Sequence, residues 1–251
     1  RGSAEVVGTA LITLLVGFLL QFGWTTSFLA YAAGFLVLFL FMIFVPYHHL
    51  EEDHHVQTSQ KEPLKKEEWR LTIILAILAA MIVLCNVAVT LRIPSIVTYT
   101  FKDQHNSSSL ILSAMQLIGI LAGITFSGFV HLFKTKLITY AGVAYGLSLL
   151  AVALSPNISV LAFSALISGY TYSTALTMVF QILSANIPPQ RLNQVTSVAV
   201  LGCSTGAAIT PFALTFIGLI SQNNAFIFTV LGLAMALLSI SLLYLLKDYH
   251  E

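Results

Sequence analysis

Residues 47–70 read YHHLEEDHHVQTSQKEPLKKEEWR, and this stretch concentrates the charge of a 251-residue chain. It holds ten of the 21 charged residues (11 Lys and Arg, 10 Asp and Glu) and four of the seven histidines. Uncharged apolar segments flank it, at 71–91, 137–190 and 192–246. Because roughly 20 apolar helical residues cross a hydrocarbon core about 30 Å thick, these segments predict transmembrane helices, and residues 47–70 an aqueous loop between two membrane blocks.

The composition excludes a soluble globular domain. Only 8% of the residues are charged and 57% are hydrophobic, with a mean hydropathy of +0.90, whereas soluble domains carry about 25% charged residues. The net charge of +1 is too small to indicate a nucleic-acid partner. The lipid bilayer is therefore the first partner that the sequence predicts.

The sequence holds no pattern of a catalytic or cofactor-binding site. It has no P-loop, no HExxH and no catalytic triad arrangement, so we expect neither an enzyme nor a cofactor. The paired histidines of residues 47–70 flank three acidic residues and offer groups that zinc accepts. No helical spacing supports a closed metal site there, and we interpret the stretch as a solvated loop without metal.

Turn-forming residues divide the apolar sequence into helices. Pro, Gly, Asn and Ser, which interrupt helices, cluster at 23–26, 155–157, 187–191 and 221–224. Backbone polar groups in lipid must be paired within the segment, so the sequence predicts an all-α polytopic membrane bundle. The eight predicted spans are 5–22, 27–46, 71–93, 108–132, 137–154, 158–184, 195–220 and 224–246.

The distribution of Lys and Arg predicts the orientation. With eight spans both termini lie on one side, together with loop 47–70, and that side collects nine basic residues against two on the other. Basic residues are enriched in cytoplasmic loops, so we expect a multi-pass cell-membrane protein with both termini in the cytoplasm. The nine are Arg1, Lys61, Lys65, Lys66, Arg70, Lys134, Lys136, Arg191 and Lys247, and the two are Arg92 and Lys102.

Residues 19–46, LLQFGWTTSFLAYAAGFLVLFLFMIFVP, resemble the corner between the fifth and sixth helices of bacterial members of the major facilitator superfamily. The shared step is Gly-Trp-x-x-x-Phe, here Gly23, Trp24 and Phe28. The stretch 92–128 is similar to bacterial permeases of the same superfamily. The resemblance covers the whole chain, from the fifth helix to the C-terminus.

The resemblance implies an architecture and a function. Residues 1–46 would be the last two helices of an N-terminal bundle, 47–70 the central cytoplasmic loop and 71–251 a complete six-helix C-terminal bundle. The chain would then be a fragment that lacks four N-terminal helices, or it would cover its exposed faces by self-association. The implied function is secondary transport of a small-molecule substrate by alternating access; the alternative is a non-transporting membrane scaffold or assembly subunit.

One departure from the family pattern concerns the region after the eighth helix. Members often carry a Gly-x-x-x-Asp-Arg-x-Gly-Arg-Lys type motif there, and the matching stretch here is 128–136. Lys134 and Lys136 match its basic end, and the acidic residue is absent. The antiporter pattern of the fifth helix is only half present, so an efflux antiporter is not predicted.

Arg92 is the candidate that chemistry singles out most sharply. A charge within a membrane span costs at least about 2.5 kcal/mol and marks a functional hypothesis. Arg92 would offer a guanidinium fork to a carboxylate or another anion. The other interpretation is an arginine that extends to the outer headgroups.

A polar stripe on span 158–184 is the second candidate. Tyr170, Thr174, Thr177 and Gln181, followed by Ser184, recur at helical spacing on one face. This face either lines a water-filled path or seals a helix contact by interhelical hydrogen bonds. Gln116 and Asn86 are further membrane amides with the same two interpretations, and Gln116 joins the expected substrate-binding residues.

Small residues at a spacing of four predict close helix contacts. One set is Gly119, Gly123 and Ser127, and the other is Gly202, Gly206 and Thr210. We interpret both primarily as packing positions.

Overall fold

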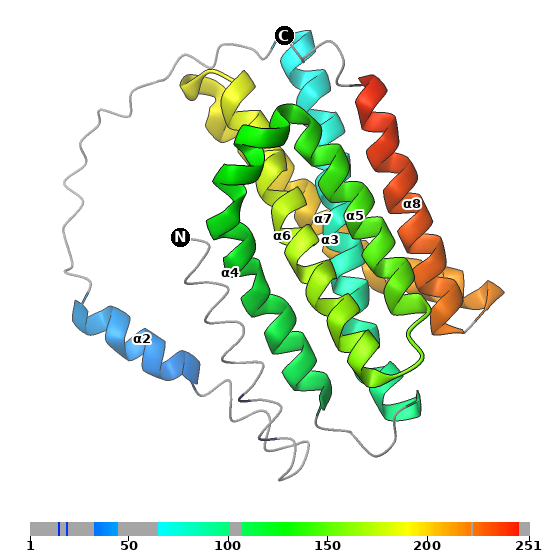
Figure 1. Ribbon diagram of the computed structural model, residues 1–251. Coiled ribbons are helices and arrows are strands. Elements are labelled where there is room, and N and C mark those ends of the chain that lie inside the picture. The colour runs from blue at the N-terminus through cyan, green and yellow to red at the C-terminus, as the bar shows by residue number, and fades with distance from the viewer. Residues whose placement is uncertain are drawn as a thin grey trace.

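The computed structural model describes residues 33–44, 65–100, 107–221 and 223–245, together with Leu15 and Leu19. Within these ranges it is helical apart from short turns and contains no strand, so the all-α prediction is confirmed there (Figure 1). The predicted span 5–22, except Leu15 and Leu19, and residues 47–64 lie outside the described residues. The helices are α2 (Ala33–Phe44), α3 (Lys66–Thr100), α4 (Ser107–Phe133), α5 (Leu137–Ala153), α6 (Ile158–Asn186), α7 (Pro189–Ile220) and α8 (Asn224–Leu245), with a 3-10 turn η3 (Lys134–Lys136).

Four stretches of the described chain are long and apolar enough to cross a membrane. One of them, Ser107–Ala153, contains the predicted span 108–132 and all but the last residue of the predicted span 137–154. The 29-residue helix α6 is not among the four, because its sequence is rich in Ser, Thr and Tyr. The total of eight spans therefore stays a prediction. The four stretches are Lys66–Thr100, Ser107–Ala153, Pro189–Ile220 and Asn224–Leu242.

Both ends of α3 differ from the sequence prediction. The helix α3 begins at Lys66, inside the predicted loop 47–70, and it continues through Pro94 to Thr100 instead of ending at residue 93. Its start is stabilised because the Glu68 carboxylate accepts a hydrogen bond from the backbone N–H of Lys65 at 3.0 Å. A glutamate at the third position of a helix makes the same contact in a capping box. Proline removes one helical hydrogen bond, but the rest of this long helix stays bonded.

The helix α7 begins at Pro189, six residues before the predicted residue 195. The sequence assigned 187–191 to a turn because prolines interrupt helices. Pro189 instead occupies the first helical position, where its missing N–H has no helical partner to lose and its fixed φ is already helical. The turn is thereby shortened, and Arg191 becomes part of the first turn of α7.

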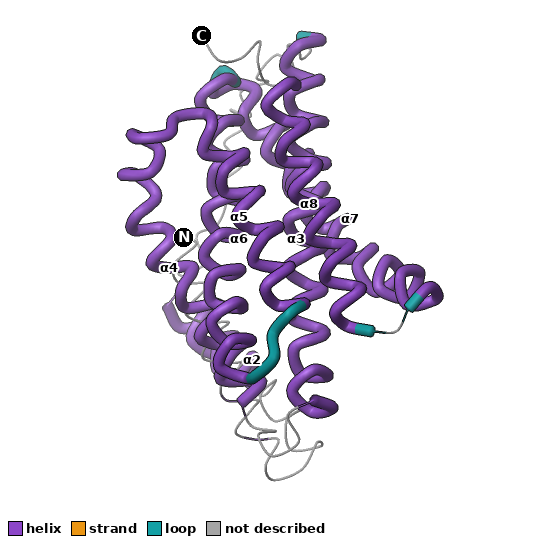
Figure 2. Tube along the Cα trace, turned by 45° about the vertical axis from the view of Figure 1, so that its right-hand side comes forward, coloured by secondary structure: helices purple, strands orange, loops and turns teal. Residues whose placement is uncertain are grey.

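Six helices form one bundle with a shared core, in which α3 and α7 run parallel and α5 and α8 run antiparallel. Figure 1 shows α3, α5 and α8 beside one another, with α6 and α4 on the other flank, and Figure 2 shows the same helices from a second direction. The most extensive contacts join α3 to α7 and α5 to α8, followed by α5 to α6 and α4 to α6. The helix α2 lies apart from this bundle in Figure 1, and its Phe35 and Met42 are exposed. The largest fully buried side chains include Tyr145, Phe228, Leu75, Ile82 and Leu183.

Glycines set the distance between the paired helices. Gly202 and Gly206 on α7 lie against the backbone of Ala76 and Ala80 on α3, close enough that a Cβ at either glycine would overlap a carbonyl oxygen. Thr210 completes the row, because its hydroxyl donates to Leu84 O of α3 at 3.4 Å. The close approach predicted for this set is thus confirmed.

The helices α4 and α6 meet in a similar way. A Cβ at Gly169 of α6 would overlap the Met115 carbonyl oxygen, and a Cβ at Gly119 of α4 would lie 2.6 Å from the Ser173 hydroxyl. By contrast, Gly123 has no neighbour within 4 Å of such a Cβ. The predicted close-contact set on α4 is therefore confirmed at Gly119 and wrong at Gly123.

Candidate functional site

One face of α6 changes character along its length. Its positions recur every three or four residues, from Phe163 and Ile167 through the predicted stripe. Phe163 and Ile167 are exposed and apolar. Farther along the same face, Thr177, Gln181 and Ser184 are exposed and polar. The half of this face that ends near Asn186 is therefore the polar half.

The middle of the stripe is occupied by helix contacts. The Tyr170 hydroxyl lies 2.6 Å from the Thr125 hydroxyl of α4, so it joins α4 to α6. Thr174 is buried, and its hydroxyl donates to Tyr170 O at 2.9 Å. Within the predicted stripe, Tyr170 contacts α4 and Thr174 is buried, whereas Thr177 and Gln181 present polar groups at the surface. Thr125 was missed, since no periodic signal on α4 marks it.

Gln116 lies on α4 beside this face. It is half-buried and follows Met115 directly, whose carbonyl oxygen lies against Gly169 of α6. Gln116 therefore follows the residue of α4 that contacts Gly169, and Tyr170 follows Gly169 on α6. An amide at this position offers both a donor and an acceptor.

Arg92 lies at a different level of the bundle. It is half-buried, and its Nη1 donates to Asn224 Oδ1 at 3.4 Å. Asn224 is the first residue of α8, which places Arg92 beside the α7–α8 turn. Along α3 it is 24 residues beyond Glu68, or about 36 Å at 1.5 Å per residue. Since Glu68 contacts Arg191, ten residues past Gln181, Arg92 and Gln181 do not form one site.

Asn86 carries a buried polar atom that makes no hydrogen bond to the described residues. This atom is the side-chain acceptor Oδ1. Such atoms are rare in folded proteins because they lose hydration without compensation. Asn86 lies within the uncharged segment 71–91 of α3, and the sequence had identified it only as one of two membrane amides.

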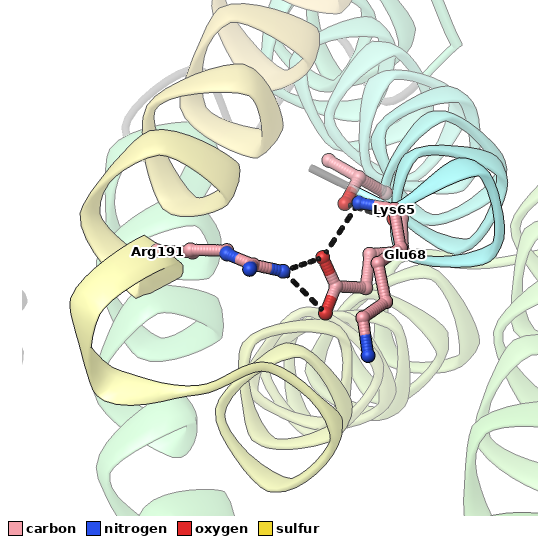
Figure 3. Close-up of polar contacts among 4 residues, drawn as sticks. Lys65, Glu68 and Arg191 are labelled. Carbon is pink, nitrogen blue, oxygen red and sulfur yellow. Dashed lines mark hydrogen bonds and ion pairs between the residues drawn. The ribbon is translucent and has the colours of Figure 1, made fainter. Parts of the chain in front are cut away.

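An ion pair closes the end of the bundle where α3 begins (Figure 3). The Arg191 Nη1 lies 2.8 Å from Glu68 Oε2 and 3.1 Å from Glu68 Oε1, and both side chains are largely buried. This pair connects the start of α3 with the start of α7. Because its geometry is supported by the Lys65 N–H, Glu68 is held in place from two sides.

Basic residues gather at this same end. The starts of α3, η3 and α7 lie there together in Figure 1. The structure thus groups six of the nine basic residues that the sequence assigned to one side of the membrane. They are Lys65, Lys66, Arg70, Lys134, Lys136 and Arg191. The paired histidines of residues 47–70 lie outside the described residues.

Comparison with known proteins gives one match. A family model described as the Major Facilitator Superfamily matches residues 1–211. The match includes α3 to α6 and most of α7, and with them every candidate residue named above except Asn224. The comparison with curated proteins finds no match.

Proposed function

Because the chain belongs to the Major Facilitator Superfamily, a family of membrane transporters, we propose that it moves a small solute by alternating access and is not an enzyme. The observation that supports this most is the exposed polar half of the α6 face. Thr177 and Gln181 present a hydroxyl and an amide on the same helical face that, earlier in α6, exposes the apolar Phe163 and Ile167. No observation favours the alternative of a non-transporting scaffold.

The proposed solute path runs along α6 between this bundle and a second one. Thr177 and Gln181 would contact the solute directly, and Gln116 would contribute from α4. Tyr170 would hold the two helices in register through the Thr125 hydroxyl, whereas Thr174 is bonded to the backbone of its own helix. Asn86 would add an acceptor for a solute that brings an O–H or N–H donor. Arg92 would bind an anionic group only at the entrance beside α8.

The remaining proposals concern architecture and orientation. The chain would supply the C-terminal bundle, at 71–251, and two helices of the N-terminal one, so it would pair with four further helices or with a second copy. The exposed apolar side chains of α2, such as Phe35 and Met42, support this. The basic end of the bundle would face the cytoplasm. If an impermeant thiol reagent labels a cysteine at Thr135 from outside intact cells, the proposed orientation is contradicted.

Transport can be tested with cells that produce the protein. Uptake and efflux of labelled sugars, amino acids and organic anions are compared with cells that carry an empty vector. We expect at least one solute to differ, and the Thr177→Val/Gln181→Leu variant to lose at least about 90% of that difference at equal membrane abundance, because its polar contacts with the solute are gone.

A matched control is the Thr174→Val variant. The Thr174 hydroxyl is buried and bonded to its own helix, so transport should remain. No difference for any solute, or equal loss in both variants, would contradict the proposed path.

A further inference from the structure

The turn between α4 and α5 combines two lysines with an aromatic surface. Lys134 and Lys136 are both exposed in η3. Lys134 adopts a left-handed conformation, with φ of 48°, which reverses the chain between the two helices. The turn residues and the end of α4 enclose a hollow of about 460 Å³, lined by Leu132, Phe133, Lys134, Thr135 and Lys136.

Aromatic rings continue from this hollow along the membrane-facing side. Phe133 stacks on Phe129 with ring centroids 6.2 Å apart, and it meets the edge of Tyr140 of α5 at 5.5 Å. Leu132 beside them is 74% exposed, and all three rings are partly exposed. Within the described residues these side chains therefore form a continuous apolar surface directly beside two ammonium groups.

The helices that form this corner carry no carboxylate of their own. The described part of the chain holds two carboxylates, Glu67 and Glu68, and both lie on α3. Glu68 is engaged by Arg191. In the sequence no acidic residue occurs between Asp103 and Asp248, so α4, η3 and α5 carry none. The start of α5 has no side-chain hydrogen bond at its cap, and helix starts favour negative charge.

We propose that this corner binds an anionic phospholipid. The phosphate would lie in the hollow between Lys134 and Lys136, and an acyl chain would follow Phe133, Phe129 and Tyr140. Lipids with a net negative headgroup are favoured over zwitterionic ones because α4, η3 and α5, which form this corner, carry two lysines and no carboxylate. Basic sites at the ends of transmembrane helices recognise anionic headgroups in this way. The inference does not depend on the proposed transport function.

Fluorescence quenching by brominated lipids tests the proposal. The full chain carries Phe133→Trp as a reporter, with Trp24 and Trp69 replaced by Phe, and is reconstituted with brominated phosphatidylglycerol or brominated phosphatidylcholine. We expect the binding constant of phosphatidylglycerol relative to phosphatidylcholine to be about tenfold. The Lys134→Gln/Lys136→Gln variant should reduce the ratio to about one.

The control is a second pair of lysines at the same end of the bundle. Lys65 and Lys66 are exposed on α3, and replacing both by Gln removes the same charge elsewhere. This variant should keep the preference. A ratio of about one in the parent chain, or equal loss of preference in both double variants, would overturn the proposal.

A second measurement avoids the tryptophan reporter and identifies the source of the phosphate. The unsubstituted chain is reconstituted in an equimolar mixture of phosphatidylglycerol and phosphatidylcholine. It is then released, and the lipids that it retains are identified by native mass spectrometry. Phosphatidylglycerol should dominate, and excess soluble glycerol phosphate should not displace it, because the acyl chain contributes to binding. Displacement by glycerol phosphate, or retention of both lipids in equal amounts, would contradict a lipid site.

Discussion

We expect the Gly206→Ala variant to lose about 1–3 kcal/mol of unfolding free energy, the range seen for overpacked cores. A Cβ at residue 206 would lie 2.8 Å from the carbonyl carbon of Ala80 and closer still to its oxygen. These are backbone atoms of α3, so no side chain can turn away to make room. The helices α3 and α7 would have to separate, and one of the two most extensive helix contacts of the bundle would be weakened.

The matched control lies on the same helix. Gly218 of α7 has no atom within 4 Å of an added Cβ, and Ala is favoured over Gly in helices by about 1 kcal/mol. Gly218→Ala should therefore be neutral or slightly stabilising. Denaturant unfolding of the two variants in the same detergent gives the comparison, and similar stability of both would contradict the packing described for α3 and α7.

The second large effect is expected where α5 meets α8. A Cβ at Gly146 would lie 2.6 Å from Gly232 O, and a Cβ at Gly232 would lie 2.8 Å from Gly146 O. Each glycine thus receives the carbonyl of the other. We expect each single change to Ala to cost about 1–3 kcal/mol of unfolding free energy, since both force the same two helices apart.

The two changes should not add. Once Gly146→Ala has separated α5 from α8, the Gly232→Ala Cβ meets space that is already open. The double variant should therefore lose less than the sum of the single variants, with an interaction energy of at least about 0.5 kcal/mol. Additive losses in a double-mutant cycle would show that the two glycines act at independent contacts.

Helix identity could be predicted from the sequence because it depends on local properties. Uncharged segments of the required length correctly predicted α3 to α8. The four-residue spacing of Gly202, Gly206 and Thr210 predicted a close contact, and the α3 backbone occupies it. Spacing does not reveal which helix crosses where, and for that reason Gly123 was wrongly grouped with Gly119.

Helix ends and long-range partners were less predictable. Charge was used to mark the end of a span, yet Lys66 and Arg70 are exposed positions on a helix that has already begun. Arg92 meets Asn224 across 132 positions of sequence, a contact that depends on where α8 begins. Likewise, the stripe on α6 is uniform in sequence, and only its packing on α4 separates Tyr170 and Thr174 from Thr177 and Gln181.

Water access along α6 tests the central claim most directly. Single cysteines are placed along α6 in a chain with Cys85→Ala and Cys203→Ala, and reaction with an impermeant thiol reagent is measured in permeabilised membranes. Cysteines at Thr177, Gln181 and Ser184 should react, and a cysteine at buried Met178 should not. A cysteine at Leu147 of α5, exposed on an apolar face, should be protected by lipid. Reactivity at the three polar positions no greater than at Leu147 would contradict a water-filled solute path.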